Sequence, residues 1–242
     1  MTKECTFILI NQIYEGKKMT NKINSEAFFK ISYGLYAVSS FSGNKINGYI
    51  SNAVFQVTAQ PPQFGVCSSK NNFTTELINE SKVLSISVLK KETDSKLLGN
   101  FGYKSGRDID KFADVKYMTG STGVPILLDD TIAWFECKVT QTIDLGTHIL
   151  FIAEIIENDL MDSTGEPLTY AYYRDVKKGK APKNAPTYIN KESTQTPASD
   201  AEKYRCTVCG YTYNQTDKKF ADLSDNWTCP VCGVDKSNFE FI

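Results

Sequence analysis

The sequence predicts a mainly β protein with short helices, followed by a small metal-binding domain at its C-terminal end. Segments rich in β-branched and aromatic residues recur between turn residues, which is typical of short strands. Within Ile132–Ile143, apolar and polar side chains alternate from Phe135 to Val139, as in a strand with one buried face. Four of the seven cysteines fall in the last 37 residues, which indicates a separate unit. The length of 242 residues suits one medium domain and one small one.

The elements follow from local signals. A short helix is expected over Glu26–Ser32, because Ser25 before it is a suitable N-cap. Six strands and two further helices are predicted: strands at Leu35–Phe41, Gly48–Thr58, Gln63–Ser68, Val83–Leu89, Ile132–Ile143 and His148–Asn158, and helices at Thr74–Glu80 and Asp94–Gly99. Short strands joined by turns, with helices as inserts, favour a barrel or a sandwich.

The composition changes after Asp175. Val176–Tyr188 is basic and interrupted by prolines, and we expect it to lie on the surface of the β domain. Asn190–Ala201 has almost no apolar side chain to bury, which predicts a flexible tether. The predicted domains are an N-terminal extension (1–24), the β domain (25–188), a linker (189–202) and the cysteine-rich domain (203–242).

Charge and composition exclude several function classes. A net charge of −1 offers no broad basic field for nucleic acid. His148 is the single histidine, so a site built on several imidazoles is excluded. Neither a G-x-G-x-x-G nor a G-x-x-x-x-G-K-[ST] run occurs, which disfavours dinucleotide and P-loop folds. The apolar stretches are too short to cross a membrane, so we expect a cytoplasmic protein without nucleic-acid or membrane partners.

Two C-x2-C pairs, each followed by glycine, are the sharpest chemical signal. They supply Cys206, Cys209, Cys229 and Cys232. In a compartment that keeps thiols reduced, such pairs more often bind a metal than form disulfides. Four thiolates around one ion predict a tetrahedral site for either iron or zinc, and the gap between the pairs does not decide between them. A structural zinc ribbon therefore remains an alternative.

The residues around the cysteines resemble a known family. Lys203–Phe241 combines Cys-Pro-x-Cys-Gly with aromatic residues that suit a small core, namely Tyr211, Tyr213, Trp227, Phe239 and Phe241. In this respect the segment is similar to rubredoxin. The resemblance implies that the four cysteines bind one iron, which carries one electron at a time.

The β domain also carries a family pattern. Asn47–Thr58 reads N-G-x-x-x-N-x-x-x-Q-V-T, and Pro61-Pro62 and Ser105-Gly106-Arg107 follow it. Over Ser25–Tyr188 the chain resembles the flavin reductase-like, FMN-binding split-barrel family. The resemblance implies that Asn47, Ser51, Asn52 and Ala53 line the isoalloxazine of FMN, that Cys67, Ser68 and Ser69 follow the strand end, and that Lys70, Asn72, Phe73 and Thr74 lie toward the ribityl phosphate.

Two further positions have both a functional and a structural interpretation. Ser105, Gly106 and Arg107 could donate to the phosphate or the pyrimidine of FMN, since a guanidinium binds phosphate in a bidentate fork. The alternative for Arg107 is a surface ion pair with Asp108 or Asp110. His148 corresponds to the histidine of a family G-D-H motif on the nicotinamide side, with Thr147 in place of the acid, or it is simply a packed neutral side chain.

The remaining single cysteines and the aromatic pair on one strand are assigned no chemistry. Cys67 and Cys137 are expected to be buried core thiols, whatever else Cys67 lies beside. Trp134 and Phe135 are expected to lie in the core or in a dimer surface.

Together the two halves resemble fusions known as high-molecular-weight rubredoxins. This implies an oxidoreductase that passes electrons from NAD(P)H through FMN to an Fe(Cys)4 centre, and on to a redox partner such as a flavodiiron oxygen or nitric-oxide reductase. It also implies a homodimer with FMN near the subunit boundary. A ferredoxin-type donor would leave the same sequence. The alternatives are a flavin-binding barrel with a zinc-ribbon interaction tail and no turnover, and a flavin reductase that releases reduced flavin.

Overall fold

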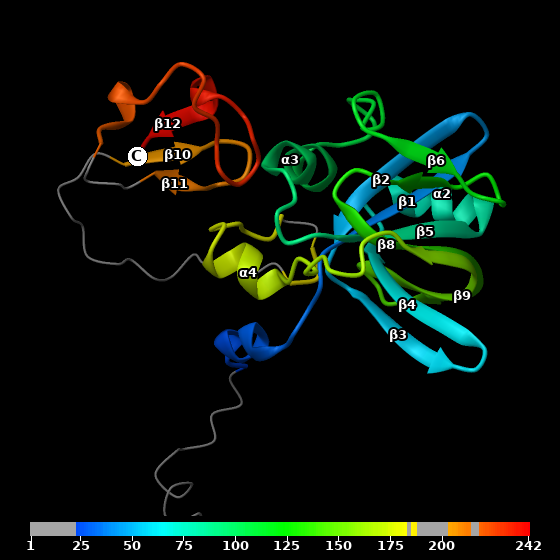
Figure 1. The fold of residues 1–242 in the computed structure, drawn as a ribbon. Coiled ribbons are helices and arrows are strands. Elements are labelled where there is room, and N and C mark those ends of the chain that lie inside the picture. The colour runs from blue at the N-terminus through cyan, green and yellow to red at the C-terminus, as the bar shows by residue number, and fades with distance from the viewer. Residues whose placement is uncertain (1–22, 183–184, 188–202, 214–217) are drawn as a thin grey trace, which may run out of the picture. The chain divides into compact units, whose positions relative to one another are not determined.

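The computed structural model describes residues 23–182, 185–187, 203–213 and 218–242 (Figure 1). The chain divides into two units between Ile31 and Ser32, and the barrel and the cysteine-rich domain both belong to the second. In the first unit, η1 (Ser25–Lys30) is a 3-10 helix whose N-cap is Asn24. The predicted cap, Ser25, is therefore wrong by one residue, because the Asn24 carboxamide accepts the Glu26 N–H at 3.0 Å. Apart from Ile23 and Asn24, the predicted extension lies outside the described residues.

Seven antiparallel strands form the main sheet, in the order β2-β1-β5-β8-β9-β4-β3 (Figure 1). They are β1 (Tyr36–Ser42), β2 (Lys45–Ser51), β3 (Val54–Ala59), β4 (Pro62–Ser69), β5 (Val83–Leu89), β8 (Thr131–Asp144) and β9 (His148–Leu160). The two edge strands, β2 and β3, are consecutive in the chain and are joined by only Asn52 and Ala53. Two residues can link opposite edges only if the sheet curls until those edges approach each other. The barrel prediction is confirmed by this topology.

The prediction of one strand over Gly48–Thr58 is wrong. At Asn52–Ala53 the chain stops pairing with β1 and begins to pair with β4. The Cys67 N–H donates to the Ala53 carbonyl at 2.9 Å, and the Ser51 hydroxyl accepts the Ala53 N–H at 3.3 Å. These bonds hold the chain at a break that the alternation of side chains does not show.

An apolar cluster fills the barrel between these strands. Its buried members include Val38, Val66, Ile86, Phe151 and Ala153, each at most 1% exposed. The cluster holds the sheet closed around the bend, because apolar surface removed from water favours the curled form.

The helices are short and capped by side chains. α2 (Phe73–Ser81) begins after Asn72 and packs against β1 and β2, and α3 (Ser95–Tyr103) begins after Asp94 (Figure 1). α3 continues four residues past its predicted end, because Gly99 lies inside the helix instead of terminating it. In the β domain three described elements were not predicted: α4 (Tyr170–Asp175), β6 (Tyr117–Thr119) and β7 (Pro125–Leu127). Each is six residues or fewer, too short to show a period.

The cysteine-rich domain has a small sheet in the order β11-β10-β12, with β10 (Tyr204–Cys206), β11 (Thr212–Tyr213) and β12 (Phe239–Phe241). η2 (Phe220–Asp222) and η3 (Lys236–Asn238) complete it. Phe220 stacks on Tyr204 at 4.2 Å between ring centroids and also contacts Trp227 and Phe239. The predicted aromatic core is present, with Phe220 at its centre.

The segment after α4 lies on the β domain where it is described. The Lys177 ammonium donates to the Thr93 carbonyl at 2.8 Å, as expected for the basic stretch. The predicted tether lies outside the described residues. Within the parts of the chain that the structure describes, no helix combines the length and the apolar character needed to span a bilayer.

Candidate redox sites

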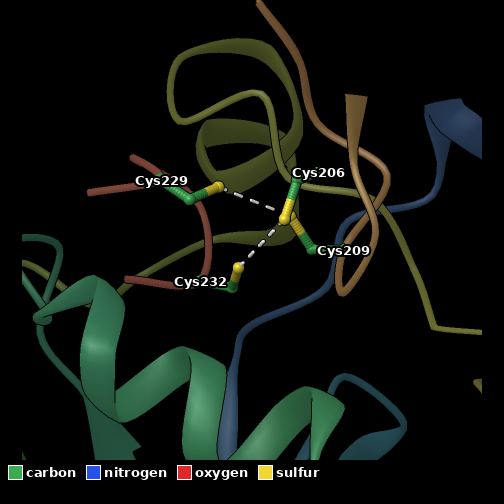
Figure 2. A group of neighbouring side chains, drawn as sticks. All are labelled: Cys206, Cys209, Cys229 and Cys232. Atoms are coloured by element: carbon green, nitrogen blue, oxygen red, sulfur yellow. Dashed lines mark hydrogen bonds between the residues drawn. The ribbon is translucent and has the colours of Figure 1, made fainter. Parts of the chain in front are cut away.

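Four cysteine sulfurs from two chain segments converge in the C-terminal domain (Figure 2). Cys206, Cys209, Cys229 and Cys232 are all buried, and their Sγ atoms lie within 4.8 Å of one another. The Sγ atoms of Cys206 and Cys232 are 3.7 Å apart, and those of Cys209 and Cys229 are 3.6 Å apart. A tetrahedral ion with metal–sulfur bonds of about 2.3 Å needs sulfur–sulfur separations of about 3.8 Å. The sulfur cage therefore has the size of a metal site.

A glycine closes each cysteine turn. Gly210 and Gly233 have φ angles of +72° and +71°, in the left-handed region that favours glycine. Their N–H groups donate to the carbonyls of Cys206 and Cys229 at 2.9 and 2.8 Å. The glycine in each Cys-x-x-Cys-Gly repeat is needed so that the chain can turn back and aim both sulfurs inward.

Hydrogen bonds within the cage favour the thiolate form of Cys229, whereas they raise the pKa of Cys209. Bonds from the Cys209 and Cys232 side chains, together with the N–H groups of Cys232 and Val231, lower the pKa of Cys229 to about 3. A thiolate is the form that binds a metal. Sulfur ligands alone, in a tetrahedral cage with backbone N–H donors, are the donor set of an iron or zinc tetrathiolate.

In the barrel, the predicted flavin residues come together where β2, β4 and α2 meet. The Asn47 carboxamide donates to the Thr74 hydroxyl at 2.9 Å, which joins β2 to the first turn of α2. A Cβ atom on Gly106 would lie 2.1 Å from the Asn47 oxygen, so the 105–107 loop reaches this point only because residue 106 is glycine. The structure thus brings three separate sequence segments to one place.

Further polar side chains lie at the end of β4. Together with those where β2 and α2 meet, they form what we call the polar bed. The Ser68 hydroxyl donates to the Thr75 hydroxyl at 2.6 Å, which in turn donates to the Ser69 carbonyl at 2.8 Å. Thr75 was not predicted from the sequence. It follows Thr74 in a helix that starts beside β4, and this position would have been enough to predict it. Most of the bed's small polar side chains are buried: Asn47, Ser51, Asn52, Ser68, Ser69, Thr74 and Thr75. Buried amides and hydroxyls of this kind fit the pyrimidine oxygens and the ribityl chain of a flavin.

Two basic side chains near the bed have carboxylate partners. The Arg107 guanidinium pairs with Glu76 on α2 and lies 5.0 Å over the Phe73 ring. The alternative partners for Arg107, Asp108 and Asp110, are therefore wrong, because the 105–107 loop turns the side chain toward α2. Lys70 pairs with Asp144 at 2.7 Å and is partly exposed.

His148 is the first residue of β9 and lies beside the end of β4. It pairs in register with Ser69, and the Lys70 N–H donates to the Thr147 carbonyl at 3.1 Å. The Nδ1 atom of His148 is 2.9 Å from the Thr147 hydroxyl. Its Nε2 is buried and has no hydrogen-bond partner among the described residues. The imidazole therefore has one ring nitrogen available for a ligand next to the strand end.

Burial raises the pKa of both other described cysteines. Cys137 is fully buried with a pKa of about 12, and Cys67 is half-buried with a raised pKa. Both therefore stay thiols at neutral pH. Trp134 is buried in a satellite cluster with Val83 and Ile126, which agrees with the core interpretation.

Comparisons with known proteins decide the family. The flavin reductase-like domain family matches residues 28–179, and the rubredoxin family matches residues 203–239. The chain belongs to the flavin reductase-like family. It carries a rubredoxin domain after the flavin reductase-like barrel, in the order that the sequence predicted. The chain therefore has a flavin-binding barrel and a rubredoxin domain whose four cysteines bind iron.

Two relatives and one solved structure are similar to this flavin reductase-like chain. It is 42% identical to the high molecular weight rubredoxin of Moorella thermoacetica, over 91% of this chain and all of that protein. It is 43% identical to an NAD(P)H ferric-chelate reductase of Archaeoglobus fulgidus, over 68% of this chain and 96% of that one. An FMN-binding protein of Thermus thermophilus shares the fold at a TM-score of 0.55 and 24% identity, over 62% of this chain and 86% of that one.

Proposed function

We propose that this protein is an oxidoreductase that takes electrons from NAD(P)H onto FMN in the barrel and passes them to the iron of the rubredoxin domain. One observation carries the proposal: a buried polar bed and a four-sulfur cage lie within one compact unit of the same chain. FMN, when bound, accepts a hydride as two electrons and releases electrons singly, which matches a two-electron donor to a one-electron iron.

The chain's own residues would bind and orient the flavin. Asn47 is fixed by Thr74, so its carboxamide oxygen keeps one orientation toward the bed. Ser68 is fixed by Thr75 in the same way. Ser51, Asn52 and Ala53 at the break between β2 and β3 would line the ring system, and Asn72 with the first turn of α2 would lie toward the phosphate. His148, with Nε2 available, would meet the nicotinamide side.

The names of relatives support the donor and the class of acceptor. Similarity to an NAD(P)H ferric-chelate reductase favours a nicotinamide donor. A diflavin flavoprotein of Synechocystis is 26% identical over 62% of this chain, and the match covers 26% of that protein. A barrel of this kind within a longer flavoprotein supports a flavoprotein acceptor, and we propose the flavodiiron type.

A second candidate function is direct reduction of a ferric chelate by the barrel. The observation that favours it is the high coverage of the Archaeoglobus reductase, whose match to this chain is confined to 164 residues. In that case the rubredoxin iron would not be needed for turnover.

Anaerobic stopped-flow with NADH tests the main proposal and separates the two candidates. Flavin absorbance should bleach first and the ferric tetrathiolate band should follow. The variant Cys229→Ser removes one sulfur of the cage, so it should lose the iron band and keep flavin reduction.

The control is Cys137→Ala, which removes a buried thiol outside the cage and should keep both signals. Iron bleaching before flavin would contradict the proposed order. Ferric-chelate reduction at the wild-type rate in Cys229→Ser would favour the second candidate.

A further inference from the structure

The second cysteine turn lies directly against α3 of the barrel. A Cβ atom on Gly99 would lie 2.0 Å from the Cys232 carbonyl oxygen, and one on Gly233 would lie 2.9 Å from the Lys96 backbone. Both distances are too short for any side chain. The Gly99 face of α3 and the Cys232–Gly233 peptide are therefore in direct backbone contact, which explains why a glycine is tolerated inside α3.

The first cysteine turn meets the β domain at Lys180, which follows α4. The Lys180 ammonium donates to the Gly210 carbonyl, while the Lys180 carbonyl accepts the Tyr103 hydroxyl at 2.6 Å. The glycines of both cysteine turns thus face residues of the β domain. Leu97, Leu98 and Phe101 share one apolar cluster with the cysteines, so the contact also buries apolar surface.

Two tyrosines lie between the cage and the barrel. The Tyr103 hydroxyl donates to Lys180, so in its 2.6 Å bond with Tyr173 it is the acceptor. Tyr173 is a buried member of the apolar cluster that contains the four cysteines, and Tyr103 packs against this cluster. Tyr103 and Tyr173 also line one pocket with Asn52, a residue of the predicted flavin bed.

We propose that the Gly99 face of α3, with the Tyr103–Tyr173 pair, is the docking surface across which electrons pass from the flavin bed to the metal cage, and that Gly99 is a positioning residue for this step. The occupant is the protein's own rubredoxin domain. This surface borders the Asn52 pocket on one side and contacts the Cys232 peptide on the other, so it lies between the two sites.

The step is a simple electron transfer. A reduced flavin gives up one electron and the ferric tetrathiolate takes it, so that iron(III) becomes iron(II) and no bond forms or breaks. The second electron follows when the ferrous centre has passed its own to the acceptor. Both electrons originate in the hydride of the nicotinamide. This inference rests on the proposed function for the identity of the donor site.

The variant Gly99→Ala, made in the full-length holoprotein, tests the proposal. Alanine favours the helix itself, so α3 should form at least as well, but its methyl group cannot fit against Cys232. Flash photoreduction of the bound flavin should then show iron(III) reduction slowed by about tenfold, because a small misplacement of two redox groups is costly. Hydrogen exchange should show faster exchange at the Gly233 amide and in the cysteine turns.

The matched control is Asn100→Ala on the same helix. Its side chain bonds only to Lys104 in the hydrogen bonds that the structure gives it, so iron reduction should stay within about twofold of the wild type. Lys180→Ala, which removes the contact with Gly210 at an exposed side chain, should also slow the transfer. This second variant keeps the proposal testable if Gly99→Ala folds poorly.

The outcomes separate this proposal from the proposed function. Transfer at the wild-type rate in both Gly99→Ala and Lys180→Ala overturns the docking surface, and so does an equal loss in Asn100→Ala. Photoreduction starts from the flavin itself, so a failure of NADH to reduce the wild-type flavin would overturn the proposed donor and leave this test intact.

Discussion

Lys111 is a buried cation whose hydrogen bonds, among the described residues, all go to backbone carbonyls. Its ammonium donates to the carbonyls of Gly48 and Phe101 at 2.9 and 3.1 Å, and the residue is 5% exposed. Burial lowers the pKa of Lys111 to about 8. In the folded protein the Lys111 ammonium therefore loses its proton near pH 8, whereas in the unfolded chain it keeps the proton up to about pH 10.4.

The predicted consequence is a stability difference that grows with pH. Below about pH 8 the folded state carries the full free-energy cost of burying the charged ammonium. Between about pH 8 and 10.4 only the unfolded state still binds the proton, so this cost falls steadily as the pH rises. The free energy of unfolding of the wild type, relative to Lys111→Met, should therefore rise by about 3 kcal/mol across this window. Urea denaturation at pH 7 to 10 measures it, with Lys116→Met as the exposed-lysine control. A flat difference would contradict the assignment.

For single residues, the sequence identifies metal ligands more readily than the side chains that hold functional residues in place. Cys206 and its three partners follow from spacing alone, since two C-x2-C-G turns have few other uses. The partner of Arg107 does not follow, because Glu76 lies 31 positions away in the chain and only the fold brings it near. For the same reason Tyr103 was missed, since its partner Tyr173 lies 70 positions away.

The β6–β7 hairpin shows how one side chain orders an element. Glu136 on β8 is fully buried, and its carboxylate accepts the N–H groups of Ser121 and Thr122 at 3.0 and 2.6 Å. Burial alone would raise the pKa of Glu136, but the hydrogen bonds from Thr122 and Ser121 outweigh it and the pKa is lowered. The hairpin tip is thus anchored to the main sheet by a charged acceptor.

Glu136→Gln should destabilise the protein by about 1–3 kcal/mol near neutral pH, because an amide NH2 would face N–H donors. The loss should shrink as the pH falls below 4.5, since the wild-type carboxyl then takes up a proton and the stability it contributes is lost. Thermal unfolding at pH 7 and at pH 3.5 or so measures both effects. Glu157→Gln, an exposed neighbour on β9, is the control. An equal loss in both variants would rule out the anchoring role.

Long elements were predictable and breaks were not. β5 has the bounds Val83–Leu89 that its run of apolar residues predicts, because every position of a buried strand is apolar or small. The break at Asn52–Ala53 was missed, since both halves have good strand character and only the exchange of partner strands interrupts them. The predicted end of α3 at Gly99 is wrong for a similar reason, because the local sequence does not show what packs against this glycine.

At the scale of the whole molecule, the main sheet exposes apolar side chains on its strands β3 and β9. Phe55 and Val57 on the edge strand β3 are 52% and 43% exposed, and Ile156 and Leu160 on β9 are 47% and 62% exposed. Exposed apolar side chains of this size are typical of an interface. We therefore propose that the homodimer implied by the family resemblance forms through these side chains.

Ile156→Asp should therefore shift the protein from dimer to monomer, since a carboxylate at a buried interface would be left unpaired. Size-exclusion chromatography with light scattering measures the mass. Thr119→Asp adds the same charge on exposed β6 and should leave the dimer intact. A wild type that runs as a monomer at micromolar concentration would refute the homodimer, and a dimeric Ile156→Asp would refute this surface.

By itself the sequence determined the β class, the order of the two domains and the four sulfur ligands, because composition, alternation and short spacing are local properties. Tertiary structure alone decided where the strand breaks, which carboxylate pairs with Arg107 and why Gly99 lies inside a helix. Those features depend on groups that are distant in the chain and close in space, where a carbonyl against a glycine leaves no room for a methyl group.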